Sequence, residues 1–222
     1  VGFVVNLDYE NPYLSPFEEF QRFKLHPSIK SYFKNGKRIS YGARAINEGG
    51  LQSVPKLVFP GGCLIGCSAG FVNVPRIKGT HNAMKSGMLA AEAAFKQLST
   101  NKEKTTPLLN DYDLSWKKSI IWKDLWKVRN VKPSLKWGLI FGNIHAGINM
   151  WLNDLGLGFL IPYTLKHKKP DHLSLIKASE CKKIEYPKPD NEVSFSRTDS
   201  VFLAATHHEE NQPIHLVLSN NK

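Results

Sequence analysis

Residues 59–95, FPGGCLIGCSAGFVNVPRIKGTHNAMKSGMLAAEAAF, decide the fold of this chain. The apolar run at 63–66 predicts a short buried strand. A glycine-rich turn and a loop follow it, and small and apolar residues then recur at helical spacing over 80–98. The segment is therefore predicted to form a strand, a turn, a loop and a helix, in that order.

The predicted helix at 80–98 carries two apolar faces. Larger side chains form a stripe at i, i+4 and i+7 spacing: Met84, Met88, Ala91, Phe95 and Leu98. Smaller residues lie on another face, where they allow a neighbouring backbone to approach closely: Ala83, Gly87, Ala90 and Ala94.

This order of elements suits a flavin. Reduction places negative charge on N1 and O2 of the flavin ring, and a helix N-terminus offers free N–H groups with a partial positive charge. Segment 66–70 supplies backbone that can approach a flat ring, and Lys78-Gly79-Thr80 leads into the helix. On the residues alone, a helix packed on a sheet with no ligand is an equally good interpretation, because glycine motifs give frequent false positives.

Helix and strand signals also occur outside this stretch. Segment 15–18 (SPFE) predicts a helix start, at which Ser15 caps the helix and Glu18 completes a capping box. The helix is expected to end by residue 26 because Pro27 follows. Two segments are predicted as strands from their residue types: 1–7 and 37–46.

Composition and charge narrow the class of protein. The chain has 222 residues, of which 41% are hydrophobic and 22% charged, as in ordinary globular proteins. Its 30 Lys and Arg against 19 Asp and Glu give a net charge of +11, which favours an anionic partner. Nucleic acid is not the expected partner, because no RNA- or DNA-binding motif occurs. Three cysteines are too few for a disulfide framework and favour a reducing compartment.

Four long motifs resemble the electron-transfer flavoprotein–ubiquinone oxidoreductase family. They are YGARAINEGGLQSVPKL (41–57), residues 59–92 of the stretch quoted above, YTLKHK (163–168) and IEYPKPD (184–190). The resemblance runs over nearly the whole chain and is densest at 41–92. It implies FAD as the cofactor, electron-transfer flavoprotein and ubiquinone as partners, and attachment to a membrane surface.

The resemblance also implies the site residues. FAD contacts are expected at Gly66, Ser68, Gly70, Asn73, Gly79, Thr80 and Met84. Many related flavoproteins have a Gly-Asp pair where this chain has Gly66-Cys67-Ser68, so the contact of Ser68 lacks a carboxylate. No catalytic acid or base is expected, because the cofactor carries the chemistry.

Other parts of the family pattern are missing from this sequence. No G-x-G-x-x-G fingerprint for the FAD pyrophosphate occurs. A [4Fe–4S] cluster takes four cysteine thiolates and this chain has three cysteines, so no metal ligand is assigned. Because the chain begins with Val1 and 1–7 reads as an interior strand, it is expected to be an internal or C-terminal piece of a longer protein.

The glycines at 48–52 suggest a weaker site. Gly49, Gly50 and Gln52 could line the flavin or quinone cavity. The alternative, a glycine turn between two strands, is favoured about two to one.

An apolar stretch at 137–165 raises the question of a membrane. It contains five glycines and several polar residues, whereas a spanning helix needs about 20 apolar residues. Both flanks are basic, without the asymmetry of a spanning segment. A re-entrant or interface-lying element is therefore predicted. Its membrane-facing residues are Trp137, Ile140, Phe141, Trp151 and Phe159. The alternative is a buried hairpin of a soluble domain.

Together these observations predict an α+β or α/β fold. The chain is expected to be a fragment of a two-layer FAD-binding flavoprotein fold with a membrane-associated helical hairpin and an irregular C-terminal tail. The expected parts are a quinone-side domain (1–58), the end of the FAD domain (59–106), a helical membrane-facing segment (107–170) and the start of a truncated ferredoxin-like region (171–222).

The expected function is electron transfer from reduced electron-transfer flavoprotein to ubiquinone. The location implied is the matrix side of the inner mitochondrial membrane, or the cytoplasmic membrane in a bacterium. Two alternatives stay open: a flavin-dependent reductase of isoprenoid lipids on the same fold, and a non-catalytic membrane-surface protein.

Overall fold

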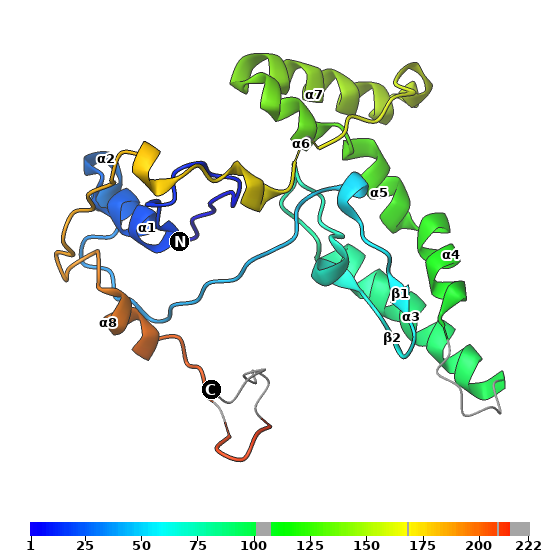
Figure 1. Ribbon diagram of the computed structural model, residues 1–222, viewed down its shortest axis with the longest axis horizontal. Coiled ribbons are helices and arrows are strands. Elements are labelled where there is room, and N and C mark those ends of the chain that lie inside the picture. Colours follow the sequence, from blue (N-terminus) through cyan, green and yellow to red (C-terminus); the bar gives the residue numbers. More distant parts are fainter. Residues whose placement is uncertain (101–107, 168, 208, 214–222) are drawn as a thin grey trace. The chain divides into compact units, whose positions relative to one another are not determined.

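The computed structural model describes residues 1–100, 108–167, 169–207 and 209–213. The chain divides into two compact units, one formed by Val1–Arg44 with Lys169–Lys222 and the other by Ala45–Lys168. The fold is mixed, mostly helical with one small sheet among the described residues (Figure 1). The predicted boundary at 106–107 and the end of the predicted tail at 214–222 lie outside the described residues.

The second unit contains a two-stranded antiparallel ribbon, which follows the 3₁₀ turn η1 (Leu51–Ser53). Strand β1 (Val58–Phe59) pairs with β2 (Gly62–Cys63), with Val58 opposite Cys63. A Cβ on Gly62 would lie 2.5 Å from the Phe59 ring, so a larger residue here would push this exposed ring aside. The predicted strand at 63–66 is thus wrong in extent: it ends at Cys63 because β1 offers two pairing residues, and a 3₁₀ turn, η2 (Gly66–Ala69), follows.

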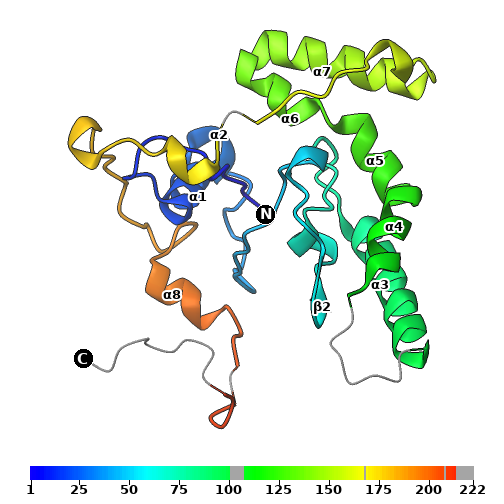
Figure 2. The same cartoon turned by 45° about the vertical axis from the view of Figure 1, so that its right-hand side comes forward.

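Helices form the rest of the second unit. Helix α3 (Thr80–Thr100) confirms the predicted helix at 80–98. Beside α3, helices α4 (Asn110–Lys118) and α5 (Ile120–Val128) follow each other (Figures 1 and 2). At the far end of α5 lie α6 (Val131–Ser134), η3 (Leu135–Trp137), α7 (Leu139–Asp154) and η4 (Gly158–Leu160).

The core of the second unit lies between α3, α4, α5 and the segment around β1. Its fully buried side chains include Leu57, Phe71, Tyr112, Ile121 and Leu125. Helix α3 joins this core through residues that are small or polar, namely Asn82, Ser86, Ala90 and Ala93, whereas Met84, Met88, Phe95 and Leu98 are exposed. Of the predicted small face, Ala90 is buried, whereas Ala83, Gly87 and Ala94 are half-buried, so the buried face is centred beside the predicted one.

The first unit holds two helices near its start: α1 (Pro16–Leu25) and α2 (Pro27–Lys30). Three short elements follow later in the chain: η5 (Asp171–Ser174), η6 (Ala178–Glu180) and α8 (Arg197–Phe202). The predicted start of α1 is confirmed, because the Ser15 hydroxyl accepts a hydrogen bond from the Glu18 N–H. The capping box is wrong: the Ser15 N–H donates instead to the Tyr186 hydroxyl at 3.0 Å.

The strands predicted at 1–7 and 37–46 are also wrong. Both segments are irregular, and no strand lies beside either of them in the described part of the chain. An extended segment is stable as a strand only when a neighbour accepts its backbone hydrogen bonds. Residues 1–7 are held by side chains instead, with the Phe3 ring 5.7 Å from Phe20 and 5.3 Å from Phe23.

Across the described ranges, each helix is too short or too polar to cross a bilayer.

The packing of α7 on α6 gives a testable prediction. A Cβ on Gly142 would lie 2.6 Å from the Ser134 carbonyl oxygen and 2.8 Å from Leu135 Cα, both backbone atoms that cannot move aside. Gly142→Ala should therefore lower the free energy of unfolding by about 1–3 kcal/mol in urea titrations. The control is Gly147→Ala on the same helix, where a Cβ meets nothing within 4 Å. It should be neutral or stabilising by up to about 1 kcal/mol, and equal losses in both variants would contradict the packing argument.

Candidate functional site

The residues expected to contact FAD gather where η2 meets the first turns of α3. Gly66, with φ at +56°, donates its N–H to the Ser86 hydroxyl at 2.9 Å. A Cβ on Gly66 would lie 3.1 Å from Ala83 Cβ. A positive φ and this close contact both require a residue without a side chain. The beginning of η2 is thereby fixed against α3.

Gly79, just before α3, also allows two backbone segments to approach each other closely. Its Cβ would lie 3.1 Å from Val72 Cγ2 and 3.3 Å from the Phe71 carbonyl oxygen. Between them the loop 73–78 is closed by two backbone hydrogen bonds, one in each direction, between Asn73 and Lys78. We call this arrangement of η2, the loop 73–78 and the first turn of α3 the cradle. It brings Gly66, Gly70, Gly79 and Thr80 into one small region.

Three of the expected FAD residues are accessible in the cradle: Ser68, Thr80 and Met84. Gly70 has φ at +78°, which favours glycine, and it is buried, although a Cβ there would meet nothing within 4 Å. The first three N–H groups of α3 have no acceptor in the described part of the chain. The cradle thus offers free backbone donors and exposed hydroxyl groups together.

Asn73 behaves differently from the other expected residues. Its side chain is 1% exposed. Its Nδ2 donates to Asp124 Oδ1 at 2.9 Å, and its Oδ1 accepts from the Arg76 N–H at 3.3 Å. Both ends of the amide are therefore bound within the chain, and Asn73 supports the loop from inside.

Asp124, on α5, is a residue that the sequence analysis missed. It also accepts hydrogen bonds from His81 Nε2 at 3.1 Å and Asn82 Nδ2 at 3.0 Å. Burial acts to raise the pKa of Asp124, but hydrogen bonds from Asn82, Asn73 and His81 outweigh burial and leave the pKa below its usual value. One signal could have found it: Asp124 is the single acid among seven Lys and Arg in 115–136.

The expected quinone-side residues lie in a loop next to η2. Asn47 Nδ2 donates to the Cys67 carbonyl at 3.2 Å and joins the two segments. Gln52 Nε2 donates to the carbonyls of Arg129 at 2.5 Å and Leu165 at 2.8 Å. His167 Nε2 lies 2.6 Å from the Gly49 carbonyl oxygen. The alternative of a turn between two strands is wrong, because irregular chain precedes Gly50 and the 3₁₀ turn η1 (Leu51–Ser53) follows it.

Arg129, at the end of α5, binds residues 161–164 of the chain that follows α7. Its side chain is 2% exposed and stacks over the Trp126 ring at 3.9 Å. It donates to the carbonyls of Trp126, Ile161 and Tyr163 and to the Thr164 hydroxyl. Burial lowers its pKa. This guanidinium is satisfied by neutral oxygens, without an ion pair to a described carboxylate.

A chain of hydrogen bonds fixes the protonation of His145 on α7. The Leu165 N–H donates to Asn130 Oδ1 at 2.9 Å, so Asn130 Nδ2 faces Asn149 Oδ1, also at 2.9 Å. Asn149 Nδ2 then faces His145 Nε2 at 3.1 Å, and this ring nitrogen must accept. The Ser134 hydroxyl donates to the Asn130 carbonyl, so it accepts from His145 Nδ1, which lies 2.6 Å away. His145 is therefore neutral with its proton on Nδ1. Burial lowers the pKa of His145, in agreement with this neutral form.

Beside this polar cluster, α7 and its flanks expose many apolar side chains. All five residues predicted to face a membrane are at least half exposed: Trp137, Ile140, Phe141, Trp151 and Phe159. Further exposed side chains extend the set: Leu139, Ile144, Ile148, Leu155 and Leu160. We call these ten residues the α7 apolar surface. Contiguous apolar areas of this kind mark contact with a partner or a membrane.

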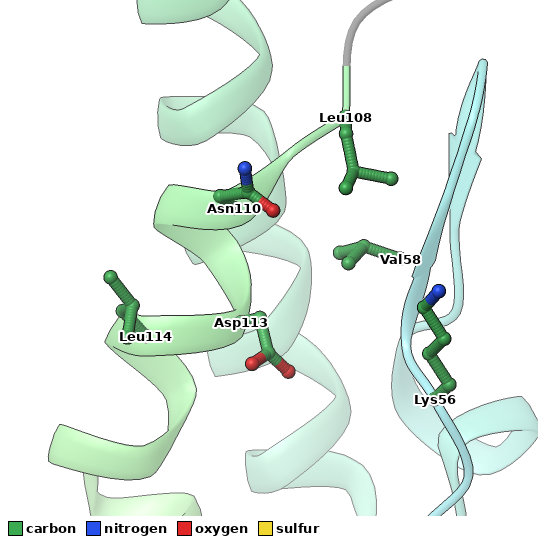
Figure 3. Close-up of a pocket in the computed structure, with 6 residues that line it drawn as sticks. All are labelled: Lys56, Val58, Leu108, Asn110, Asp113 and Leu114. Atoms are coloured by element: carbon green, nitrogen blue, oxygen red, sulfur yellow. The ribbon is translucent and has the colours of Figure 1, made fainter.

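A separate cavity of about 400 Å³ lies between β1 and α4 (Figure 3). Its lining is Lys56, Val58, Leu108, Asn110, Asp113 and Leu114. It contains no residue of the cradle or of the Gly49 loop. In the described residues, no three His, Cys, Asp or Glu side chains lie close enough together to hold a metal.

Comparison with known proteins bears out the sequence resemblance. The family described as "ETF-QO, ubiquinone-binding" matches residues 1–46. The chain is 56% identical over 226 residues to the mitochondrial electron transfer flavoprotein-ubiquinone oxidoreductase of Rattus norvegicus, covering 100% of this chain and 36% of that protein. The protein of the same name from Dictyostelium discoideum is 53% identical over 227 residues, covering 97% of this chain and 37% of that protein. The chain thus spans just over a third of the length of these relatives.

The neutral His145 predicts a pH dependence of stability. Its pKa is lower in the folded chain than the usual value of about 6.5 in the unfolded chain, so the unfolded state binds the proton first. The stability due to neutral His145 is therefore present above about pH 6.5 and is lost as the pH falls. In urea titrations at about pH 7.5 and about pH 5.5, His145→Gln should lose less free energy of unfolding on acidification than the wild type. His172→Gln, at an exposed histidine, is the control and should keep the wild-type pH dependence; the same behaviour in His145→Gln would refute the prediction.

Proposed function

Since this chain is identified along its whole length as a segment of the electron-transfer flavoprotein–ubiquinone oxidoreductase family, we propose that it works in electron transfer from reduced electron-transfer flavoprotein to ubiquinone. The observation that carries this proposal is the identity of more than half of all positions over the full chain. No feature of the structure favours the isoprenoid-lipid reductase or the non-catalytic alternative over it.

The cradle fits the pyrimidine side of FAD. Free N–H groups at the start of α3 and the exposed Thr80 hydroxyl can stabilise negative charge on the reduced ring, because the helix N-terminus carries partial positive charge. Gly66 and Gly79 keep η2 and the loop close to α3. FAD, when bound, supplies the redox chemistry. The segment 59–106 is accordingly proposed as the end of an FAD-binding domain of the two-layer flavoprotein type.

A [4Fe–4S] cluster does not fit this chain. Such a cluster takes four cysteine thiolates, and the chain has three cysteines. Two of them, Cys63 and Cys67, belong to the second unit, and Cys181 belongs to the first. No step of the proposed function is assigned to a cluster held by these residues.

We propose that the α7 apolar surface rests on a membrane. We call α7 and the returning chain, residues 139–167, the α7 hairpin. It needs no spanning helix to bind a membrane, since exposed aromatic and aliphatic side chains can enter the headgroup region from one side. Basic residues flank the surface at Lys136 and Lys166, and each basic charge near an anionic membrane contributes about 1 kcal/mol. Lys132 is instead paired with Glu48 at 3.5 Å. The relatives are named mitochondrial, which supports a mitochondrial location. The matrix side of the inner membrane is the surface that we propose for this contact.

The quinone side of the proposed site includes Gly49, Gly50 and Gln52. This loop is joined to η2 by Asn47 and to the end of the α7 hairpin by Gln52 and His167. It therefore lies between the cradle and the chain that returns from the α7 apolar surface. A quinone that arrives from lipid would meet this loop on its way to the flavin. The ubiquinone-binding description of residues 1–46 supports a quinone-side part at 1–58.

The flavin assignment is tested at Thr80. In the FAD-loaded protein, Thr80→Ala removes a donor to the reduced ring and should lower the flavin midpoint potential, measured by spectroelectrochemical titration. Quinone reduction by reduced electron-transfer flavoprotein should slow in parallel. Thr100→Ala, at the other end of α3, is the control and should leave the potential unchanged. An unchanged potential in Thr80→Ala would rule out the proposed contact.

The membrane assignment is tested with two matched phenylalanines. Phe141 on α7 is 74% exposed and Phe95 on α3 is 77% exposed. Phe141→Asp should reduce co-sedimentation with anionic liposomes, because a carboxylate in the apolar interface is costly. Phe95→Asp should bind liposomes like the wild type. Equal binding of all three proteins, or an equal loss in both variants, would contradict the role of the α7 apolar surface.

A further inference from the structure

One carboxylate holds both ends of the segment that carries Thr80. Asp124 Oδ1 accepts from Asn73 Nδ2 at 2.9 Å, and Oδ2 accepts from His81 Nε2 at 3.1 Å and Asn82 Nδ2 at 3.0 Å. Asn73 begins the loop 73–78, and His81 and Asn82 follow it on the first turn of α3. Gly79 and Thr80 therefore lie between two anchors on a single side chain.

The orientation of Asn82 shows how strongly this carboxylate directs its surroundings. Asn82 is 0% exposed, and its Oδ1 is buried without a hydrogen-bond partner in the described part of the chain. A buried unpartnered oxygen costs free energy. Rotating the amide would place this oxygen against a carboxylate, so the N–H to Asp124 is kept and the oxygen is left unpaired.

The negative charge of Asp124 is also stabilised by its position. Asp124 belongs to α5 but lies beside the N-terminal turn of α3, where a negative charge is stabilised by the partial positive charge of the helix end. The surrounding donors are two neutral amides and one imidazole, and no Lys or Arg pairs with it in the described residues. The carboxylate can thus bind several N–H groups at once instead of a single cation.

We propose that Asp124 is the positioning residue of the cradle, which fixes Gly79 and Thr80 for contact with the flavin by anchoring the loop 73–78 and the first turn of α3 together. This rests on the proposed function, since it assumes that Thr80 contacts FAD. Asp124 acts through Thr80 and the helix N–H groups, so its removal weakens their effect on the flavin.

The proposal is tested by a double-mutant cycle on the flavin midpoint potential of the FAD-loaded protein. Thr80→Ala is introduced into the wild type and into Asp124→Asn. The expected result is that the shift caused by Thr80→Ala falls to less than half in the Asp124→Asn background, because Thr80 is no longer held in place. Asp111→Asn is the matched control. Asp111 lies on α4, and its carboxylate accepts a hydrogen bond from Lys96 Nζ at 2.6 Å, farther along α3 than the turn that Asp124 binds. It should leave the Thr80→Ala shift at its full size.

A second measurement does not depend on the flavin. Hydrogen exchange of the hydrogen-bonded backbone amides of Asn73, Lys78 and Ala83 should be about tenfold faster or more in Asp124→Asn, the factor expected when hydrogen bonds to a charged group are lost. Asp111→Asn should leave these amides unchanged. If Asp124→Asn does not fold, His81→Ala removes one donor at an exposed side chain and should show both effects to a smaller degree.

The outcomes separate the two ideas. Potential shifts that add fully in the cycle would overturn the positioning role, whatever the exchange rates show, and would leave the proposed function standing. Unchanged exchange at Asn73, Lys78 and Ala83 would overturn it as well. No shift from Thr80→Ala in the otherwise wild-type protein would reject the flavin contact itself, and with it this role of Asp124.

Discussion

The close approach of η2 and the loop 73–78 to the first turns of α3 is the constraint on which the candidate site depends. It is possible because Gly66 and Gly79 have no side chain where a Cβ would come within 3.1 Å of Ala83 and Val72. Once these backbones touch, the Ser86 hydroxyl can bind the Gly66 N–H. The large apolar side chains of α3 are left on the opposite face, and the start of the helix is left uncovered. Packing through small residues thus both builds the core and keeps a set of donors free.

The α7 hairpin is organised by a different kind of interaction. Arg129 and Asn130 bind the backbone of 161–165, so the returning chain is held by polar contacts behind α7. His145 and Asn149 continue these contacts from α7 itself. Because the polar side chains of α7 are used on this inner face, its apolar side chains lie outward. The exposed apolar surface is therefore a consequence of how the hairpin closes.

Local signals in the sequence predicted what local interactions determine. The cap at Ser15, the proline after α1 and the helix beginning at Thr80 were all read correctly, since each depends on neighbouring residues. The strands at 1–7 and 37–46 failed because a strand depends on a partner that the pattern does not contain. Asp124 and Arg129 were missed for a related reason: their partners lie tens of positions away in the sequence. The glycines of the cradle were predicted as one group because they all lie in the contiguous motif 59–92, which carries the family resemblance.

Asp124 and Arg129 also show how the parts of the second unit are connected. Asp124 lies within α5 and Arg129 at its C-terminal cap. In the described residues, neither forms an ion pair with a Lys, Arg, Asp or Glu side chain. Asp124 accepts hydrogen bonds from two amides and an imidazole, and Arg129 donates to carbonyls and a hydroxyl. One holds the cradle and the other holds the chain that returns from the α7 apolar surface. Since a single short helix carries both, the spacing between the proposed flavin contact and the proposed membrane contact is set by α5. The proposed electron transfer to a quinone that enters from lipid depends on such a fixed spacing, and α5 carries both residues that set it.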